Sequence, residues 1–478
     1  MQITKDLTSI SVTDLAAAIR EKEISPVEVV DHYLERTEEL NPKLNAFVAV
    51  LAEQARAQAR ESEGRIQRGA ARPLEGVPIP IKDNVLLAGV PMFEGSRMAP
   101  DMPAPMDTEL VARLRNAGAV FTGKTNLPEF GTIPSTEGDR FGAAHNPWDL
   151  SRTPGGSSGG AAAAVAAGLA PAAHGNDGGG SLRIPASCCG VFSIKPSRGR
   201  VSRGPLPGND PAGFVIDGFL TRTVRDNALL MDVVSGPALG DPYWAPPPQR
   251  PFVDEVGASS GRLRIGWTDV APIDVPIDPA CGAAVRDAAA LCESLGHQVE
   301  EHTPAWRNDE LLPLFMQVWA SLVGTDVEFW ASLGGDPSLA EPHNRALWEQ
   351  GRALPATSLG LAIAKLQLFV RQILTSWETY DVILTPTLAL PPVPLGWMFQ
   401  GSEADPMAPM TMAGVFTPFT AQINVSGQPA ASLPLSWHDG LPIGVQAIGR
   451  PAGESILYRL CAQLEEARPW ADRRPPIA

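Results

Sequence analysis

The sequence predicts an α/β fold in which helices cover the faces of a central sheet. Segments with helical periodicity alternate with short apolar runs that are typical of buried strands. Capping signals mark some helix starts, as at Ser25-Pro26-Val27-Glu28, where Ser25 can cap, Pro26 suits the first turn and Glu28 can complete a capping box. The length of 478 residues allows one large domain or two smaller ones.

The first half of the chain shows the clearest alternation. The helix that follows Ser25 is expected to end near Leu40, because Pro42 disfavours a helical residue before it. The apolar run from Val77 to Ile81 predicts a buried strand with Lys82 at its tip. The expected elements are, in order, a helix over 25–40, a strand over 45–50, a helix up to about 68, a strand over 77–81, a helix over 107–117, a strand over 119–122, a helix over 161–167 and a strand over 169–173.

The second half repeats the α/β pattern around a long helical stretch. Residues 309–377 are expected to be mainly helical, whereas proline-rich segments at 241–249 and 386–394 predict loops. The further expected elements are strands over 263–267, 299–302 and 382–384, and a helix over 279–295.

Composition and charge exclude several classes of partner. Hydrophobic residues make up 44% of the chain and charged residues 19%, as in an ordinary soluble globular protein. The formal net charge of −15 argues against a nucleic-acid partner or an anionic membrane, because both would be repelled. No apolar run is long enough to predict a membrane-spanning helix.

The cysteines are sparse and odd in number, so they form no disulfide framework, and no CxxC pair predicts a metal site. They are expected to be buried thiols in a reducing compartment, and the N-terminus has no apolar signal core. We therefore expect a cytoplasmic protein. The five cysteines are Cys188, Cys189, Cys281, Cys292 and Cys461.

Two glycine-rich loops contain the serines that are the candidate catalytic residues. Residues 154–160 read Pro-Gly-Gly-Ser-Ser-Gly-Gly, and residues 176–181 read Asn-Asp-Gly-Gly-Gly-Ser. Glycines let backbone N–H groups turn toward a ligand, an arrangement that suits a developing oxyanion. A serine among them can attack a carbonyl if a base takes its proton, and Lys82 can be that base if burial keeps it neutral. A single loop of this kind would more often be a flexible turn; the combination indicates catalysis.

These loops resemble the signature of the amidase signature family. The resemblance extends to Lys82-Asp83-Asn84, to the segments 123–130 and 146–148, and to the C-terminal segments 427–432 and 441–446. It covers most of the chain and is weakest over residues 241–390. The run from Asn176 to Ser181, with Cys188-Cys189-Gly190 after it, is similar to the subgroup that includes 6-aminohexanoate cyclic dimer hydrolases and aryl acylamidases.

The resemblance implies a Ser–cis-Ser–Lys triad. Ser181 would be the nucleophile, Ser157 the proton relay and Lys82 the base, and the Gly156–Ser157 peptide would be cis. The backbone N–H groups of Gly178, Gly179, Gly180 and Ser181 would form the oxyanion hole. Family members more often carry a side chain at the position of Gly178, so the loop is expected to be roomier here.

Other residues of the signature are expected to support this site. Asp177 and Arg183 flank the nucleophile, and we interpret them as fixing its loop by hydrogen bonds or an ion pair. Ser158 is assigned to the same supporting group. Cys188 and Cys189 are interpreted as a buried pair on a packed helix. Four hydrophobic residues have helical spacing: Phe315, Met316, Trp319 and Leu322. We interpret them as core residues, and the alternative is that they form a wall of the substrate pocket.

Two motif matches compete with this interpretation. Residues 118–125 fit the nucleotide P-loop pattern around Lys124, but the four central residues read as a strand and no helix follows. Residues 155–159 fit the nucleophile elbow of α/β-hydrolases, which would make Ser157 the nucleophile of an esterase. That alternative needs a downstream histidine, and the candidates look like surface or satisfied side chains; they are His174, His297, His302, His343 and His438.

The family resemblance completes the expectations. It implies one domain over residues 1–478, with a mixed, twisted central β-sheet sandwiched between α-helices, a signature core at about 70–220 and a variable pocket region at about 240–390. The expected reaction is hydrolysis of bulky neutral, aryl, cyclic or carbamate-like amides through an acyl-enzyme, without metal or organic cofactor. The expected partner is a small-molecule amide, and a homodimer is compatible with the sequence. The alternatives are the glutaminase subunit of a tRNA-dependent amidotransferase and a catalytically silent binding protein.

Overall fold

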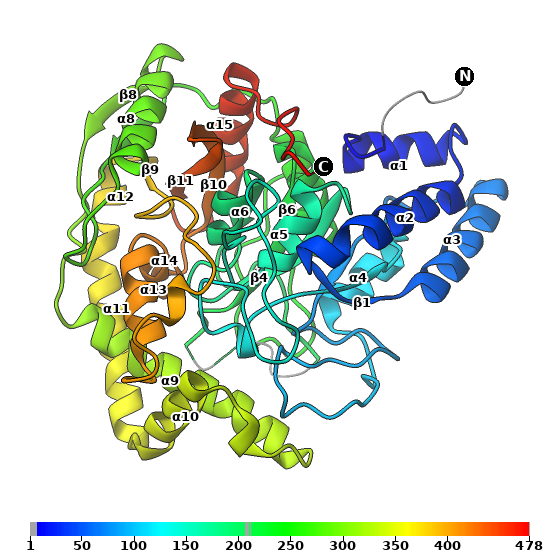
Figure 1. The fold of residues 1–478 in the computed structure, drawn as a ribbon. Coiled ribbons are helices and arrows are strands. Elements are labelled where there is room, and N and C mark those ends of the chain that lie inside the picture. Colours follow the sequence, from blue (N-terminus) through cyan, green and yellow to red (C-terminus); the bar gives the residue numbers. More distant parts are fainter. Residues whose placement is uncertain (1–6, 206–209, 211, 478) are drawn as a thin grey trace.

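A mixed sheet of eight strands runs through the middle of the part of the chain that the structure describes, in the order β4-β6-β5-β10-β11-β9-β7-β8 (Figure 1). This computed structural model describes residues 7–205, 210 and 212–477. Neighbouring strands are antiparallel from β4 to β9, whereas β9, β7 and β8 run parallel. In chain order, the strands of this sheet are β4 (Ala172–Asp177), β5 (Phe192–Lys195), β6 (Ile216–Thr221), β7 (Arg264–Trp267), β8 (Gln298–Glu301), β9 (Val382–Pro386), β10 (Ala430–His438) and β11 (Leu441–Gly449).

A second, three-stranded sheet brings the N-terminal segments toward the large one. Its order is β1-β3-β2, with β1 (Phe47–Val50) antiparallel and β2 (Ile81–Lys82) parallel to the central strand β3 (Gly123–Thr125). Just before β2, Pro80 O accepts from His174 N of β4 at 3.0 Å. The start of β2 therefore lies beside β4.

Helices surround both sheets (Figure 1). The N-terminal helices α1, α2 and α3 form one flank of the molecule, and α8 and α11 lie at the opposite flank. The α-helices are α1 (Val12–Arg20), α2 (Pro26–Leu44), α3 (Ala52–Gln67), α4 (Glu109–Ala117), α5 (Gly159–Ala166), α6 (Arg183–Cys189), α7 (Val224–Val234), α8 (Pro279–Ser294), α9 (Leu311–Ser332), α10 (Pro342–Ala353), α11 (Ala356–Leu374), α12 (Ser376–Thr379), α13 (Ala408–Phe416), α14 (Ala421–Ser426) and α15 (Glu454–Ala467).

Alternate residues of the large sheet enter different cores, as the two-residue period of a strand requires. On β6, Phe219 packs in a cluster with side chains of α7, α8 and α15, whereas the next residue, Leu220, packs with α5 and α6. On β9, Leu384 joins the first of these clusters and Ile383 packs with α9 and α11. Both faces of the sheet are thus covered by helices, and the predicted fold class is confirmed.

The helix after Ser25 is longer than predicted. The capping box of Ser25 and Glu28 is present, but α2 continues through Pro42 to Leu44 and ends at Asn45, which is left-handed. The Asn41 side chain accepts from Phe47 N at 2.8 Å and donates to Phe47 O at 3.0 Å. These bonds tie the helix end to β1, and this tertiary contact outweighs the cost of a proline in the last turn.

Three predicted strands lie at shifted positions. The segment 77–81 pairs regularly only at Ile81–Lys82, because Pro78 and Pro80 have no N–H for a ladder. The strand expected over 119–122 begins at Gly123, although Ile79 N still donates to Val120 O at 2.8 Å. The strand expected over 169–173 is β4, which starts at Ala172 and includes the first residues of the second glycine-rich loop.

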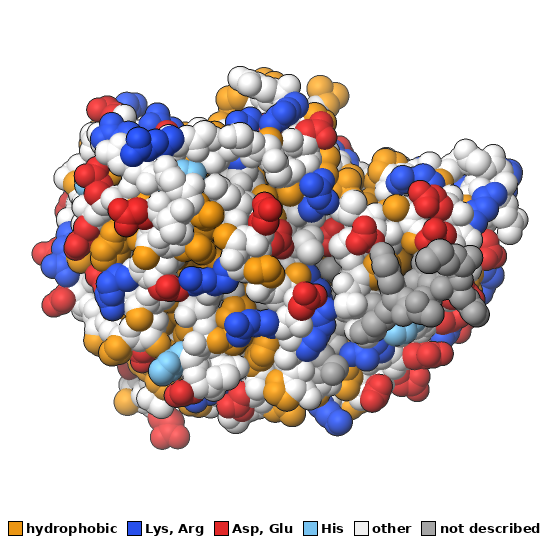
Figure 2. All heavy atoms as spheres, turned by 90° about the horizontal axis from the view of Figure 1, so that it is seen from above, with side chains coloured by type: hydrophobic (Ala, Val, Ile, Leu, Met, Phe, Trp, Pro, Cys, Tyr) orange, Lys and Arg blue, Asp and Glu red, His pale blue; other side chains and the backbone are white. Residues whose placement is uncertain are grey.

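The surface does not present a single sign of charge on the face seen in Figure 2. Acidic and basic side chains are interspersed there, with hydrophobic side chains between them. Among the described helices, none alone is long and apolar enough to cross a bilayer; a pair bent by 103°, Pro342–Ala353 with Ala356–Thr379, passes such a test by length and composition only.

Candidate active site

Lys82 lies at the end of β2 with its amine buried between the two glycine-rich loops. Its Nζ donates to Ser157 Oγ at 2.7 Å and to the side-chain oxygen of Asn176 at 2.7 Å. The side chain has no exposed surface. Burial lowers the pKa of the Lys82 ammonium to about 7, against the opposing attraction of Asp217 and Asp177. The ammonium of Lys82 can therefore lose a proton and become a neutral amine near neutral pH.

Ser157 stands at the end of the first glycine-rich loop, just before α5. The Gly156–Ser157 peptide is cis, as the resemblance led us to expect. Gly131 lies against this serine, since a Cβ at Gly131 would come within 3.0 Å of Ser157 Oγ. A side chain at Gly131 would therefore crowd the Ser157 hydroxyl.

Ser181 is positioned by the turn between β4 and α6. It is 7% exposed and lines a pocket, whereas Ser157 is 2% exposed and is not among the described residues that line it. The loops are joined by Ser158, whose N–H donates to Ser181 O at 3.3 Å and whose hydroxyl donates to Asn176 O at 3.2 Å. In the described part of the chain no hydrogen bond joins the hydroxyls of Ser157 and Ser181.

The glycine loop before Ser181 offers fewer free donors than expected. The Gly180 N–H donates to Asp177 Oδ1 at 2.8 Å, so it is already engaged. Among the described residues, no hydrogen bond engages the N–H groups of Gly178, Gly179 and Ser181. Gly180 has φ of +134° and no room for a side chain, because a Cβ there would lie 2.5 Å from Ile184.

The space beside Gly178 is not vacant. A Cβ at this position would lie 3.1 Å from a methyl group of Val215 and 3.3 Å from the Trp319 ring. The expectation of a roomier loop is therefore wrong, because a tryptophan from α9 fills the place that a side chain would take.

Asp177 and Arg183 form a buried ion pair that shapes the glycine-rich loop before Ser181. Both nitrogen–oxygen contacts, Nε–Oδ2 and Nη2–Oδ1, are 2.9 Å, and neither side chain is exposed. Arg183 also bonds Gln446 and Asn424 at 2.7 Å, which links the loop to β11 and α14. Burial opposes ionisation of Asp177, but the charge and hydrogen bonds of Arg183 outweigh it and hold the pKa at about 2. The carboxylate stays ionised and fastens the Gly180 and Leu182 N–H groups.

Four residues around Lys82 were given no role at this site by the sequence analysis. Asn176 binds its amine, and the Asn176 amide in turn donates to Asn84 at 3.0 Å. His174 accepts from the backbone N of Lys82 at 3.3 Å and contacts Asp217 at 3.1 Å. His174 is a satisfied histidine, as expected, but its place next to Lys82 was visible only once β4 had been paired with β6.

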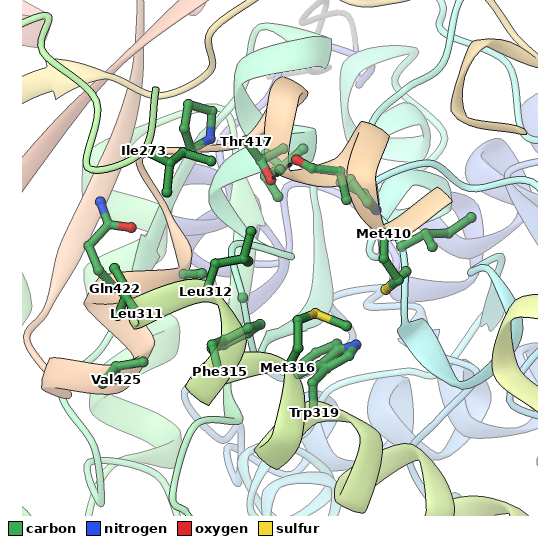
Figure 3. A pocket seen from close by; sticks show the side chains of 18 of the residues that line it. Ile273, Leu311, Leu312, Phe315, Met316, Trp319, Met410, Thr417, Gln422 and Val425 are labelled. Atoms are coloured by element: carbon green, nitrogen blue, oxygen red, sulfur yellow. Dashed lines mark hydrogen bonds between the residues drawn. The ribbon is translucent and has the colours of Figure 1, made fainter. Parts of the chain in front are cut away.

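An apolar pocket opens above Ser181 and holds about 830 Å³ of space, part of it open to solvent. Figure 3 shows Phe315, Met316 and Trp319 of α9 on one side and Met410 and Thr417 across from them. Phe315 and Trp319 stack with centroids 5.4 Å apart. No charged side chain is among the described residues that line it. The α9 aromatics are thus a pocket wall as well as core, whereas Leu322 packs only into the core.

The competing motifs are not supported by the geometry. Lys124 lies inside β3 with no exposed surface, and its Nζ donates to Val85 O at 2.7 Å, so the residues 118–125 form no phosphate loop. The Ser157 hydroxyl bonds a lysine rather than a histidine. All five cysteines are free and buried, with Cys188 and Cys189 on the packed helix α6 as predicted. The described residues contain no group of three or more His, Cys, Asp or Glu side chains that could hold a metal.

Comparisons with known proteins agree with this site. The sequence profile of the family described as Amidase matches residues 28–457. The 6-aminohexanoate-cyclic-dimer hydrolase of Pseudomonas sp. (strain NK87) is 37% identical over 482 residues, which cover 97% of this chain and 96% of that protein. The acylamidase of Rhodococcus erythropolis is 33% identical over 484 residues, covering 98% of each chain. A solved structure of 6-aminohexanoate cyclic dimer hydrolase has a TM-score of 0.93 at 36% identity and covers 99% of this chain and 100% of that one.

Fold, site and relatives together define a serine hydrolase that acts on amides. The chain belongs to the amidase signature family. The predicted family, the predicted subgroup and the predicted class of enzyme are therefore confirmed.

Proposed function

We propose that this protein hydrolyses bulky, neutral carboxamides through an acyl-enzyme on Ser181, with Ser157 as relay and Lys82 as base. The observation that carries the proposal is the 2.7 Å contact between the buried Lys82 amine and Ser157 Oγ, in a loop whose next residue, Ser158, donates its N–H to Ser181 O. A lysine whose pKa lies at about 7 is a competent base near neutral pH.

In the proposed reaction, neutral Lys82 accepts the proton of Ser157, and Ser157 takes that of Ser181. Ser181 Oγ attacks the carbonyl carbon and forms a tetrahedral intermediate. The proton returns through the relay to the nitrogen of the leaving amine as the C–N bond breaks. Water, activated by the same relay, then attacks the acyl-enzyme and releases the acid.

The oxyanion of the intermediate needs donors beside Ser181. The N–H groups of Gly178, Gly179 and Ser181 are suited to this role, because no described residue engages them. The N–H of Gly180 instead holds Asp177, which in turn fixes the turn of the loop. We therefore assign Gly180 a structural role in the oxyanion loop.

The pocket supports a bulky substrate of low polarity. Its wall of Phe315, Met316 and Trp319 offers apolar and aromatic surface next to Ser181 and no charge for a carboxylate or ammonium group. This lining, and the cyclic or acyl amides in the names of the relatives, favour lactams and anilides over glutamine. The cyclic-dimer hydrolase and the acylamidase are 37% and 33% identical to this chain.

The test is a hydrolysis screen of the purified protein against anilides, lactams, carbamates, peptide amides and glutamine. The change Ser181→Ala should lower kcat/KM for the best amide by more than about a thousandfold, because the attacking oxygen is lost. The matched control is Ser187→Ala on the following helix, where the hydroxyl bonds Gly444 N at 2.9 Å and faces no substrate. Substantial turnover by a folded Ser181→Ala protein would refute the assignment, and glutamine as the only substrate would refute the proposed class.

A further inference from the structure

A histidine–aspartate pair lies next to the backbone of Lys82, and neither residue is among the described residues that line the pocket. His174 of β4 and Asp217 of β6 contact each other through Nε2 and Oδ1 at 3.1 Å. His174 Nδ1 accepts from the backbone N of Lys82 at 3.3 Å. The imidazole has no exposed surface and Asp217 is 4% exposed. The antiparallel register of β4 and β6, with Asn176 opposite Asp217, holds both side chains in place.

The hydrogen bonds of His174 indicate the net charge of the His174–Asp217 pair. Because His174 Nδ1 accepts a backbone N–H, its proton must be on Nε2, which donates to Asp217. Burial lowers the pKa of His174, so the ring is neutral. Burial opposes ionisation of Asp217, but the hydrogen bond from His174 and the charge of Arg203 outweigh it and lower the pKa of Asp217. The pair thus carries one negative charge.

We propose that His174 and Asp217 are positioning residues for Lys82, which fix the strand end that carries it and hold a buried negative charge behind that strand end. This inference rests on the proposed function of Lys82 as the base. During turnover the lysine must alternate between amine and ammonium although its side chain is buried. Burial favours the amine, and the charge of Asp217 favours the ammonium that forms when Lys82 takes its proton.

The other charges around Lys82 leave Asp217 as the main anion. Asp177 is neutralised by its ion pair with Arg183 at 2.9 Å. Burial raises the pKa of Glu94 to about 7, although Trp330 donates to it, so near neutrality it carries only part of a charge.

Arg203 is the opposing cation in this group. It approaches Asp217 at 3.7 Å, and its side chain is 26% exposed, so solvent weakens its effect. Asp217 is also the strongest of the neighbouring charges that raise the pKa of Lys82, ahead of Asp177 and Glu94, while Arg203 lowers it. Lys124, beyond His174, adds a further positive charge on that side.

The first test is Asp217→Asn, which removes the charge at constant shape. Without it the ammonium of Lys82 loses its stabilising anion, so the acid limb of the pH profile of kcat/KM should move down by roughly one pH unit. The matched control is Asp226→Asn, a buried aspartate of α7 that binds Thr13 N at 3.0 Å far along the sheet. This control can lower stability but should leave the acid limb in place.

The second test is Arg203→Gln, which removes a positive charge instead of a negative one, at a side chain that is 26% exposed. With Arg203 absent, Asp217 acts on Lys82 unopposed, and the acid limb should move to higher pH. This variant keeps the inference open to refutation even if Asp217→Asn does not fold.

The outcomes separate the two proposals. If the native enzyme shows an acid limb that neither Asp217→Asn nor Arg203→Gln displaces, or if the limb of either variant moves in the wrong direction, the positioning role is refuted while the base survives. If the native profile has no limb, or Ser181→Ala is active, the proposed function itself fails. Opposite shifts in the two variants, with none in Asp226→Asn, would establish the role.

Discussion

Asp177 is the residue on which the shape of the nucleophile loop most depends. Its buried carboxylate accepts hydrogen bonds from two nitrogens of Arg183 and from the backbone N–H groups of Gly180 and Leu182. Asp177→Asn leaves the guanidinium unpaired and should lower the free energy of unfolding by about 3–5 kcal/mol. Chemical denaturation followed by circular dichroism would measure the change.

The matched control is a carboxylate of the surface. Asp149 contacts Arg152 at 3.2 Å with 41% of its side chain exposed. Asp149→Asn should change stability by less than about 1 kcal/mol, because water screens the pair. Equal effects of the two substitutions would show that the buried pair does not brace the loop.

Site residues can be identified from the sequence where they belong to a short motif of neighbouring residues. Ser157 and Ser181 stand in glycine-rich loops that are readable as such, and Lys82 follows an apolar run at a spacing similar to the family's. The pair of His174 and Asp217 carries no such signal, because 43 residues separate its members and only the pairing of β4 with β6 brings them together. The hydrogen bond from Gly180 N–H to Asp177 could not be predicted either, because it depends on the orientation of the Asp177 side chain.

At the scale of elements, α9 connects the pocket with the oxyanion loop. Its Trp319 lines the pocket and fills the space beside Gly178. Trp319→Ala should lower kcat/KM for a bulky anilide by roughly tenfold or more and affect a small aliphatic amide less, because the lost surface binds only the large substrate.

The control for this change lies on the same helix. Phe329 is 41% exposed and belongs to no part of the pocket lining, so Phe329→Ala should leave both activities close to native. Steady-state kinetics on the two amides would decide. An equal loss on both substrates in Trp319→Ala would contradict a role in binding and point to damage of the oxyanion loop.

Helices could be predicted better than strands. The capping box at Ser25 and the left-handed Gly118 at the end of α4 are local signals, and both are present. Strand limits depend on partners: prolines shorten β2 to two residues, and β3 starts where β1 can pair with it. Strands β10 and β11 were not predicted as such, although Asp439-Gly440 between them, both with positive φ, form the two-residue turn that is typical of a hairpin.

At the scale of the whole molecule, the C-terminal strands unite the two halves of the large sheet. β10 pairs with β5 of the signature region and β11 pairs with β9 of the later half. Arg183 reaches across to Gln446 of β11, so the strand that joins the halves also supports the nucleophile loop. This arrangement favours one domain over residues 1–478, which stays a prediction, as does a homodimer.

The central claim is that a neutral lysine, buried among the loops of both serines, is the base. Its most direct test is the pH dependence of kcat/KM of the native enzyme on its best amide. We expect activity to rise with pH through a single ionisation near 7, because the pKa of Lys82 is lowered to about 7 and only the amine accepts a proton. A profile that is flat between about pH 6 and 9 would contradict the account.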